Sequence, residues 1–298
     1  MSDQPFIAIV ILNYNQIEVT CEFIDSCKNL DYKNYRIVLV DNASENDPSE
    51  LIKVKYPEVQ LIRNAKNLGF TGGNNVGINS IKADYYFIVN NDTEVTPSVL
   101  KELLLPFQED ESLGMVSPKI RYFEKPDVIQ YAGYSKINPF TGRNQALGGK
   151  EFDRGQHDRP GYTNYAHGAA MLVKAELINK IGAFADIFFI YYEELDWSAR
   201  AVRAGYKIYY QPTAVIFHKE SITMGKESAM KAYYHNRNRV LFMKRNTSLF
   251  QFFIFSIFFL FIVTPKQILK YTVNSQKEHL KNYFKALKWN IRNYSVKY

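Results

Sequence analysis

The first half of this sequence alternates apolar runs of strand length with stretches of helical character, and this alternation restricts the fold more than any other feature. The strand-like runs cover residues 6–12, 36–40, 59–63 and 85–89, and the helical stretches cover residues 16–30, 72–82 and 97–108. Strands that alternate with helices predict an α/β fold with a mainly parallel central sheet flanked by helices. The length of 298 residues allows one large domain or two small ones.

Polar side chains follow the predicted strands at the point where each one ends. Asn13 and Asn15 follow the first strand, Asp41 and Asn42 end the second, and residues 90–92 (Asn-Asn-Asp) end a later one. Ligands of such sheets bind beyond the carboxyl ends of the strands. Turn and helix-capping roles explain any one of these groups, but they explain all three less well.

The second half is less regular. Residues 121–165 are rich in Gly, Pro, Tyr and Asn, which predicts irregular loops over a sheet edge. Regular structure is expected again from residues 168–173 onward, with helices over 175–181 and 193–205, a short strand near residue 208, and an apolar run that ends at His218.

The charge is uneven along the chain. The formal net charge is +7, and the segment from residue 266 onward accounts for all of it, with eight basic residues against Glu278. The main domain therefore offers no basic field, which argues against nucleic acid as a partner. Cys21 and Cys27 have no metal-ligand or disulfide pattern, and the N-terminus shows no signal peptide, so we expect reduced thiols and a cytoplasmic location.

Two acidic segments are candidates for chemistry. Asp92 lies in an oxygen-rich cluster at the end of a strand, which suits Mg²⁺ or Mn²⁺, although it could instead cap the next helix. Glu193, Glu194 and Asp196 crowd the start of a helix beside aromatic residues. Such carboxylates can have a raised pKa and act as a general base, or they can simply cap the helix.

His218 and the glycine-rich segment 67–78 carry weaker signals. A single His after a strand is more often a hydrogen-bonded surface group than a metal ligand. The glycines permit close backbone approach and the asparagines can bind a ligand, but their spacing matches neither the dinucleotide fingerprint nor the Walker A loop.

Taken together, these motifs resemble glycosyltransferase family 2, nucleotide-sugar-dependent enzymes with the GT-A fold, and in particular bacterial rhamnosyl- and galactofuranosyltransferase-like members. The resemblance runs from about residue 7 to residue 245. It rests on the ordered segments IVILNYN, LVDNAS, NLGFTGGNN, FIVNNDTEV, residues 168–173, and FFIYYEELDWSARAVRAGYKI followed by YQPTAVIFH.

The resemblance implies a role for each matching residue. Asp92 and His218 would bind the divalent metal, Glu194 would be the catalytic base, and Asp196 matches the acidic position that follows the base. Asn90 stands where many members have an Asp, and Glu194 stands where Asp is usual. Together with the polar residues at the strand ends and in segment 67–78, the resemblance implies donor-nucleotide contacts from Asn13, Asn15, Asp41, Gly72, Asn74, Asn75 and Asn91.

The implied reaction is an inverting displacement. A sugar passes from a nucleoside-diphosphate sugar, a UDP- or dTDP-sugar, to a hydroxyl of a glycan or lipid-linked acceptor in bacterial surface polysaccharide synthesis. Two alternatives stay open at this point. One is a carbohydrate-binding or scaffold protein that has the fold without catalysis, and the other is nucleic-acid binding through the basic tail.

The C-terminal segment differs from the rest. Residues 249–263 are apolar apart from Gln251 and Ser256, and as a helix they span about 22 Å, less than the roughly 30 Å of a hydrocarbon core. We expect insertion into a membrane surface rather than a buried helix or a true span. Lys277, Lys281, Lys285 and Lys288 recur at helical spacing beside an apolar stripe of Leu280, Phe284, Leu287 and Ile291. The sequence therefore predicts a catalytic domain over residues 1–245 and a membrane-associating extension over 246–298, peripheral or monotopic at the cytoplasmic face of the inner membrane.

Overall fold

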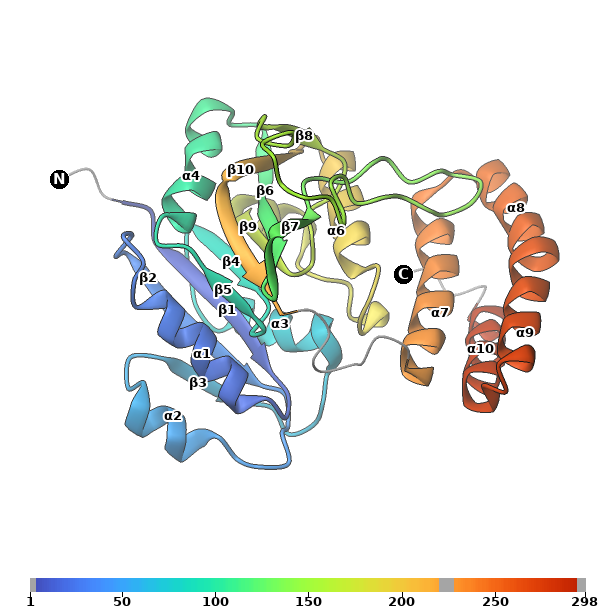
Figure 1. The fold of residues 1–298 in the computed structure, drawn as a ribbon, viewed down its shortest axis with the longest axis horizontal. Helices are drawn as coiled ribbons and strands as arrows, with labels where there is room; N and C mark the ends of the chain where they lie inside the picture. The colour runs from blue at the N-terminus through green and yellow to red at the C-terminus, as the bar shows by residue number, and fades with distance from the viewer. Residues whose placement is uncertain (1–3, 220–227, 294–298) are drawn as a thin grey trace.

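The computed structural model describes residues 4–219 and 228–293 and has one central sheet flanked by helices (Figure 1). The sheet order is β3-β2-β1-β4-β9-β6-β10-β5, with β7 paired to β6 and β8 paired to β10. The strands are β1 (Ile7–Asn13), β2 (Tyr35–Asp41), β3 (Gln60–Arg63), β4 (Tyr85–Val89), β5 (Thr93–Val95), β6 (Leu113–Tyr122), β7 (Lys125–Tyr131), β8 (Gly161–Thr163), β9 (Ala170–Lys174) and β10 (Lys207–His218). The predicted α/β fold class is confirmed.

The sheet is parallel in its first half and mixed in its second. Strands β3, β2, β1 and β4 run parallel, whereas β9 is antiparallel to both β4 and β6. Strands β5, β6, β7 and β8 were not predicted from the sequence. Two segments were expected where the structure has the single strand β10, whose register shifts between Gln211 and Val215. Pro212 lies within this shift, and proline has no N–H to donate to a ladder.

Helices cover both faces of the sheet because side chains alternate along β1. Ile7, Ile9 and Ile11 pack in one hydrophobic cluster with helices α1 (Ile17–Cys27), α2 (Ser49–Lys55) and α4 (Val99–Glu109). Ala8 and Val10 pack on the other face with α3 (Gly69–Asn79), α5 (Ala175–Ile181) and α6 (Glu193–Arg203). This arrangement brings the ends of β1, β2 and β4 to one edge of the molecule.

The glycines of α3 serve helix–sheet packing. A Cβ at Gly73 would lie 2.3 Å from Leu12 Cδ1, and a Cβ at Gly77 would lie 2.5 Å from Val10 Cγ1. Because no side chain fits in either place, glycine at these positions lets α3 lie directly on β1.

The C-terminal helices form a layer beside the sheet domain (Figure 1). They are α7 (Ala229–Asn246), α8 (Leu249–Phe258), a π-helical segment (Phe259–Val263), α9 (Thr264–Val273) and α10 (Lys277–Arg292). The helix is continuous over the 25 residues Leu249–Val273. Its most apolar stretch of 18 residues has a mean hydropathy of 2.0, and 22% of that stretch is buried. The whole helix is about 37 Å long at 1.5 Å per residue, so the 15-residue, 22 Å expectation was too short. Pro265 lies just after the π-helical segment, at the start of α9, and the helix continues through it.

The expected boundary at residues 245/246 falls within the last turn of α7, and one hydrophobic cluster spans it. Phe255 and Phe259 are buried against Phe188, Leu195 and Phe242 of the preceding part of the chain. On α10, Tyr283 and Ala286 are buried, whereas Phe284 and Ile291 of the predicted apolar stripe are 48% and 77% exposed. The extension is therefore packed against the sheet domain through one set of side chains and exposes another.

Candidate active site

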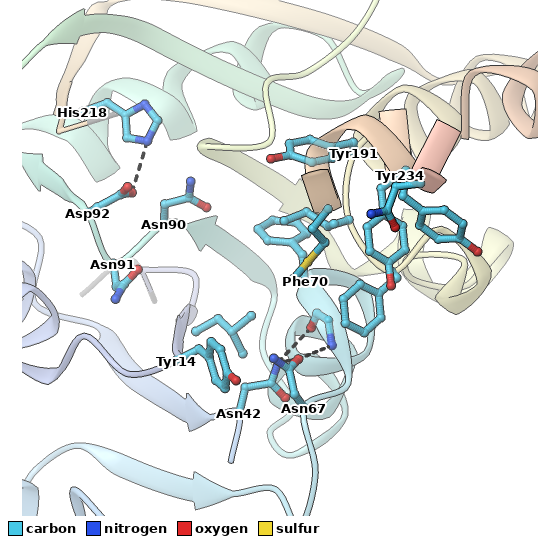
Figure 2. A pocket seen from close by; sticks show the side chains of 17 residues that line it. Tyr14, Asn42, Asn67, Phe70, Asn90, Asn91, Asp92, Tyr191, His218 and Tyr234 are labelled. Carbon is cyan, nitrogen blue, oxygen red and sulfur yellow. Dashed lines mark hydrogen bonds and ion pairs between the residues drawn. The ribbon is translucent and has the colours of Figure 1, made fainter. Parts of the chain in front are cut away.

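A pocket of about 730 Å³ opens beyond the ends of β1, β2 and β4 (Figure 2). One wall comes from the sheet edge and the other from the loop before α6 and the start of α7. The lining residues are Leu12, Tyr14, Asn42, Asn67, Gly69, Phe70, Asn90, Asn91, Asp92, Phe189, Ile190, Tyr191, His218, Met230, Tyr233, Tyr234 and Asn282. Of the predicted site residues, Asn91, Asp92 and His218 line this pocket.

Asn42 and Asn67 organise the wall beside Tyr14 and Phe70. Asn42 Nδ2 donates to Asn67 Oδ1 at 2.9 Å and to the Gly69 carbonyl at 3.1 Å, while its Oδ1 accepts from the Leu68 N–H at 3.0 Å. The sequence analysis quoted both asparagines within motifs but did not select either one as a site residue. Their position after a strand and at the start of the glycine-rich segment was the available signal.

Asp41 lies behind this wall, fully buried. Its Oδ1 accepts from Asn13 Nδ2 at 2.8 Å and from Ser44 Oγ at 2.5 Å, and Arg63 Nε lies 3.4 Å from its Oδ2. Asn15 has a φ of 55°, and its N–H donates to Ser44 Oγ at 2.8 Å. Asn13, Asn15 and Asp41 therefore shape the loop around Ser44 rather than line the pocket.

Three further predicted contacts also lie outside the pocket. A Cβ at Gly72 would lie 2.7 Å from Leu68 Cβ, and Asn74 Nδ2 donates to the Phe70 carbonyl at 2.8 Å. Asn75 donates to the Phe184 carbonyl and to Asp186 Oδ1, at 2.9 and 2.7 Å. These side chains are occupied by internal packing and hydrogen bonds because only the first turn of α3 faces the pocket.

Asp92 and His218 meet although 126 positions separate them in the chain. Strand β5 pairs antiparallel with β10, which sets His218 opposite Thr93. His218 Nε2 lies 3.1 Å from Asp92 Oδ1, and His218 Nδ1 lies 2.8 Å from Gln130 Oε1 (Figure 2 shows the first contact). Asn91 is held by its donation to Thr20 Oγ1 at 2.8 Å.

This pair fits a divalent metal that is shared with a ligand. His218 Nδ1 can donate to Gln130 Oε1, so a metal would meet His218 Nε2 and the Asp92 carboxylate, an N and an O donor. Among the described residues, no group of three or more His, Cys, Asp and Glu side chains could hold a metal. Phosphate oxygens and water would have to complete the coordination, as is common for Mg²⁺.

The loop before α6 is strained and held from α7. Phe189, Tyr191 and Tyr192 have φ values of 64°, 71° and 70°, which are costly for aromatic residues. Asn238 of α7 is fully buried and donates at 2.8 Å to each of the carbonyls of Phe188, Ile190 and Tyr191. The sequence analysis did not identify Asn238, because only the tertiary structure brings it to this loop.

Glu193 and Glu194 begin α6 directly after this loop. Each has a buried Oε2 that finds no hydrogen-bond partner within residues 4–219 and 228–293. Burial raises the pKa of Glu194 to about 7, although backbone N–H groups at the helix start lower it in part. Burial and the neighbouring Glu194 raise the pKa of Glu193 as well. Glu194 does not line the pocket; it lies behind Gly168, where an added Cβ would be 3.8 Å from the Glu194 side chain.

Asp196 lies in a different environment on the same helix. Its carboxylate is fully buried and accepts from Arg200 Nε at 3.0 Å, Arg245 Nε at 2.9 Å and Asn246 Nδ2 at 2.9 Å. Burial alone would raise its pKa, but Arg245, Asn246 and Arg200 together lower it. Asp196 thus joins α6 to the end of α7 and does not reach the pocket.

Comparison with known proteins identifies the family. The model of glycosyl transferase family 2 matches residues 8–181, more than half of the chain. The low-salt glycan biosynthesis hexosyltransferase of Haloferax volcanii is 26% identical over 79% of this chain and 74% of its own length. The N-acetylglucosaminyl-diphospho-decaprenol L-rhamnosyltransferase of Mycobacterium tuberculosis is 23% identical over 70% of this chain and 74% of its own.

The fold comparison agrees. A mannosyltransferase from Pyrobaculum calidifontis, solved in complex with GDP-Man and Mn²⁺, has a TM-score of 0.60 and 15% identity over 100% of this chain and 77% of its own. The predicted family, fold and enzyme class are thereby confirmed. This chain belongs to glycosyl transferase family 2 and is a glycosyltransferase with the GT-A fold.

Proposed function

We propose that this enzyme transfers a sugar, with inversion, from a UDP- or dTDP-sugar to a hydroxyl of a lipid-linked or glycan acceptor. The observation that carries the proposal is the convergence of Asp92 and His218 on a 730 Å³ pocket at the ends of the parallel strands. Such a pocket is large enough for a nucleotide sugar, and its position is the one at which α/β sheets bind ligands.

The donor nucleoside binds at the wall formed by Tyr14, Asn42, Asn67 and Phe70. The aromatic rings offer apolar faces to a base, and the paired amides fix the backbone around it. Asp41, with Asn13 and Asn15, supports this wall from behind through Ser44. We therefore assign these three residues a positioning role in donor binding.

Asp92 and His218 would hold a Mg²⁺ or Mn²⁺ ion, with the donor phosphates and water supplying the remaining ligands. When bound, such an ion offsets the negative charge that develops on the departing nucleoside diphosphate. Gln130 orients the His218 ring, and Asn91 lies on the same side of the pocket.

We assign Glu194 as the general base; because its side chain does not line the pocket, the acceptor hydroxyl has to reach it from the side of Gly168. Its unpartnered Oε2 accepts the proton of the acceptor hydroxyl as that oxygen attacks the anomeric carbon, and its raised pKa suits this transfer near neutral pH. Asn238 positions the base by holding the strained loop that precedes it. Asp196 stabilises the same helix and takes no part in proton transfer.

The acceptor is membrane-linked, and the enzyme contacts the membrane with the outer face of α8 and α9. The large apolar side chains exposed there are Leu249, Phe250, Phe253, Ile257, Leu260, Phe261, Ile262, Leu269 and Val273. An exposed apolar surface of this extent marks an interaction with lipid or protein, and the flanking cations Lys266 and Lys270 favour anionic lipid at the cytoplasmic face of the membrane. The relative that acts on a decaprenol-linked substrate supports this choice.

A thermal-shift screen of nucleotide sugars with Mn²⁺ tests the donor and metal assignments together. We expect one donor to raise the melting temperature in the presence of Mn²⁺ and EDTA to abolish the shift. Asp92→Asn and His218→Ala should lose the Mn²⁺-dependent shift. Asp31→Asn, which removes an exposed carboxylate paired with Lys101, is the matched control and should keep it. A shift and a transfer rate that persist in EDTA would refute the metal assignment.

A further inference from the structure

A second cavity, of about 440 Å³, lies between α7 and α10. Its lining residues are Tyr233, Asn282, Lys285, Lys288, Trp289 and Arg292, which we call the basic groove. Tyr233 and Asn282 also line the active-site pocket, so the two cavities adjoin. The groove therefore offers a binding surface that is continuous with the site of reaction.

The groove carries cations without counter-charges. Within residues 4–219 and 228–293, no carboxylate forms an ion pair with Lys285, Lys288 or Arg292. Lys281 on the same helix differs, because it lies 3.4 Å from Glu278. Three unpaired cations around one cavity attract an anion, and a phosphate group presents the oxygens that Lys and Arg bind well.

The groove is held in place by buried contacts. Tyr283 and Ala286 are buried where α10 meets α7, and Asn290 Nδ2 donates to the Arg237 carbonyl at 3.2 Å. The Arg237 guanidinium lies 4.8 Å from the centre of the Trp289 ring, which fixes one wall. The cations thus project from a positioned helix rather than from a loose tail.

The groove also adjoins the apolar surface. Helices α9 and α10 pack on each other, and α10 itself exposes Phe284 and Ile291. Figure 1 shows α8, α9 and α10 together in the layer farthest from β3. Lysine, arginine and tryptophan beside an exposed apolar face are typical of the level at which lipid phosphates lie.

We propose that the basic groove binds the phosphate or diphosphate group of a membrane lipid. Its continuity with the active-site pocket favours the diphosphate of a lipid-linked acceptor, whose sugar would then extend toward Tyr233 and Asn282. The inference rests on the proposed membrane contact of α8 and α9. Neutral and phosphate-bearing vesicles separate that apolar contact from phosphate binding in the groove.

The test is co-sedimentation of the full chain with three kinds of vesicle. These are neutral phosphatidylcholine, phosphatidylcholine with phosphatidylglycerol, and phosphatidylcholine with a polyisoprenyl diphosphate. The groove variant is Lys285→Gln/Lys288→Gln/Arg292→Gln. The control, Lys82→Gln/Lys277→Gln/Lys281→Gln, removes the same charge from exposed positions outside the groove and outside the apolar face of α8 and α9.

We expect the groove variant to bind diphosphate vesicles at least about tenfold more weakly than the parent, and the control to lose less than about threefold. The parent and both variants should bind neutral vesicles equally, which reports the apolar contact alone. A groove-specific loss confined to phosphatidylglycerol vesicles would identify a phospholipid headgroup as the phosphate source. Equal losses in the two variants, or no binding of the parent to either phosphate-bearing vesicle, would overturn the proposal.

Discussion

The carboxylates of Glu194 and Asp196 belong to the same turn of α6, yet their surroundings are opposite. Asp196 accepts hydrogen bonds from Arg200, Arg245 and Asn246, and its pKa is lowered. Glu194 is half-buried, but its Oε2 atom is buried without a hydrogen-bond partner among the described residues, and its pKa rises to about 7. Burial acts on both groups in the same direction, and the difference comes from the cations that reach only one of them.

Hydrogen-bond partners and pKa therefore distinguish a structural carboxylate from a candidate general base. A carboxylate whose oxygens are all occupied by cations and amides stays ionised and cannot readily accept a proton. A carboxylate that is buried without such partners keeps a free oxygen and a pKa near the pH at which it works. Both are acidic residues at a helix start, so sequence position alone does not distinguish them.

The largest expected effect tests the reactive side of the contrast. Glu194→Gln should lower the turnover number by about 10²–10⁴-fold, because the amide cannot take a proton from the acceptor hydroxyl. Its melting temperature at pH 8 should be unchanged or higher, since folding disfavours the ionised form of this group. Steady-state transfer assays and thermal unfolding check the two expectations. Glu193→Gln is the matched control; if it, rather than Glu194→Gln, abolishes turnover, the base is Glu193.

The next effect tests the structural side. Asp196→Ala should lower the free energy of unfolding by about 3–5 kcal/mol, because it leaves Arg200 and Arg245 partly buried without their counter-charge. Chemical denaturation of the full chain measures this loss. Since the folded pKa of Asp196 lies below its ordinary value of 3.8, its stabilising contribution is present at neutral pH and is lost as the pH falls through the folded pKa. A fully stable variant with no turnover would reverse the roles assigned to the two residues.

A pH profile sharpens the contrast further. The base must be ionised to accept a proton, so the turnover number should rise with pH and level off above about 7, the raised pKa of Glu194. One unit below that value, the rate should be about tenfold lower than the plateau. The turnover number under saturating donor and acceptor is the quantity to follow. A rate that stays flat from pH 5 to pH 8 would contradict Glu194 as the base.

The smallest expected effect concerns α8, which carries both exposed and buried phenylalanines. Phe253 is 60% exposed, whereas Phe255 is fully buried. Phe250→Ser/Phe253→Ser should weaken vesicle binding by about tenfold without lowering the melting temperature. Phe255→Ala should lower the melting temperature, because it removes a fully buried side chain, and should not weaken vesicle binding. Point substitution is the appropriate test because deletion of residues 249–298 would also remove Phe255 and Phe259, which are buried in the hydrophobic cluster that joins α8 to the sheet domain.

Much of the fold and part of the site could be predicted from the sequence. The runs that became β1, β2 and β4 consist of apolar residues at strand length, and α5 begins and ends at the expected residues. Asp92 and His218 were selected one by one from their positions after apolar runs. Their contact depends on the pairing of β5 with β10, and β5 has only three residues, too few for a recognisable pattern.

The α/β class, the order of the motifs and the distinct composition of the C-terminal segment follow from the sequence, because hydrophobic periodicity and charge are local properties of the chain. The folded structure is needed to see which asparagines line the pocket, which of the α6 carboxylates meets cations, and that α7 and α10 complete the wall. The physical reason is that a hydrogen bond or a pKa depends on the groups that surround a side chain, and in this protein those groups come from distant parts of the chain. Arg245 determines the state of Asp196 across 49 positions, and no local pattern records that contact.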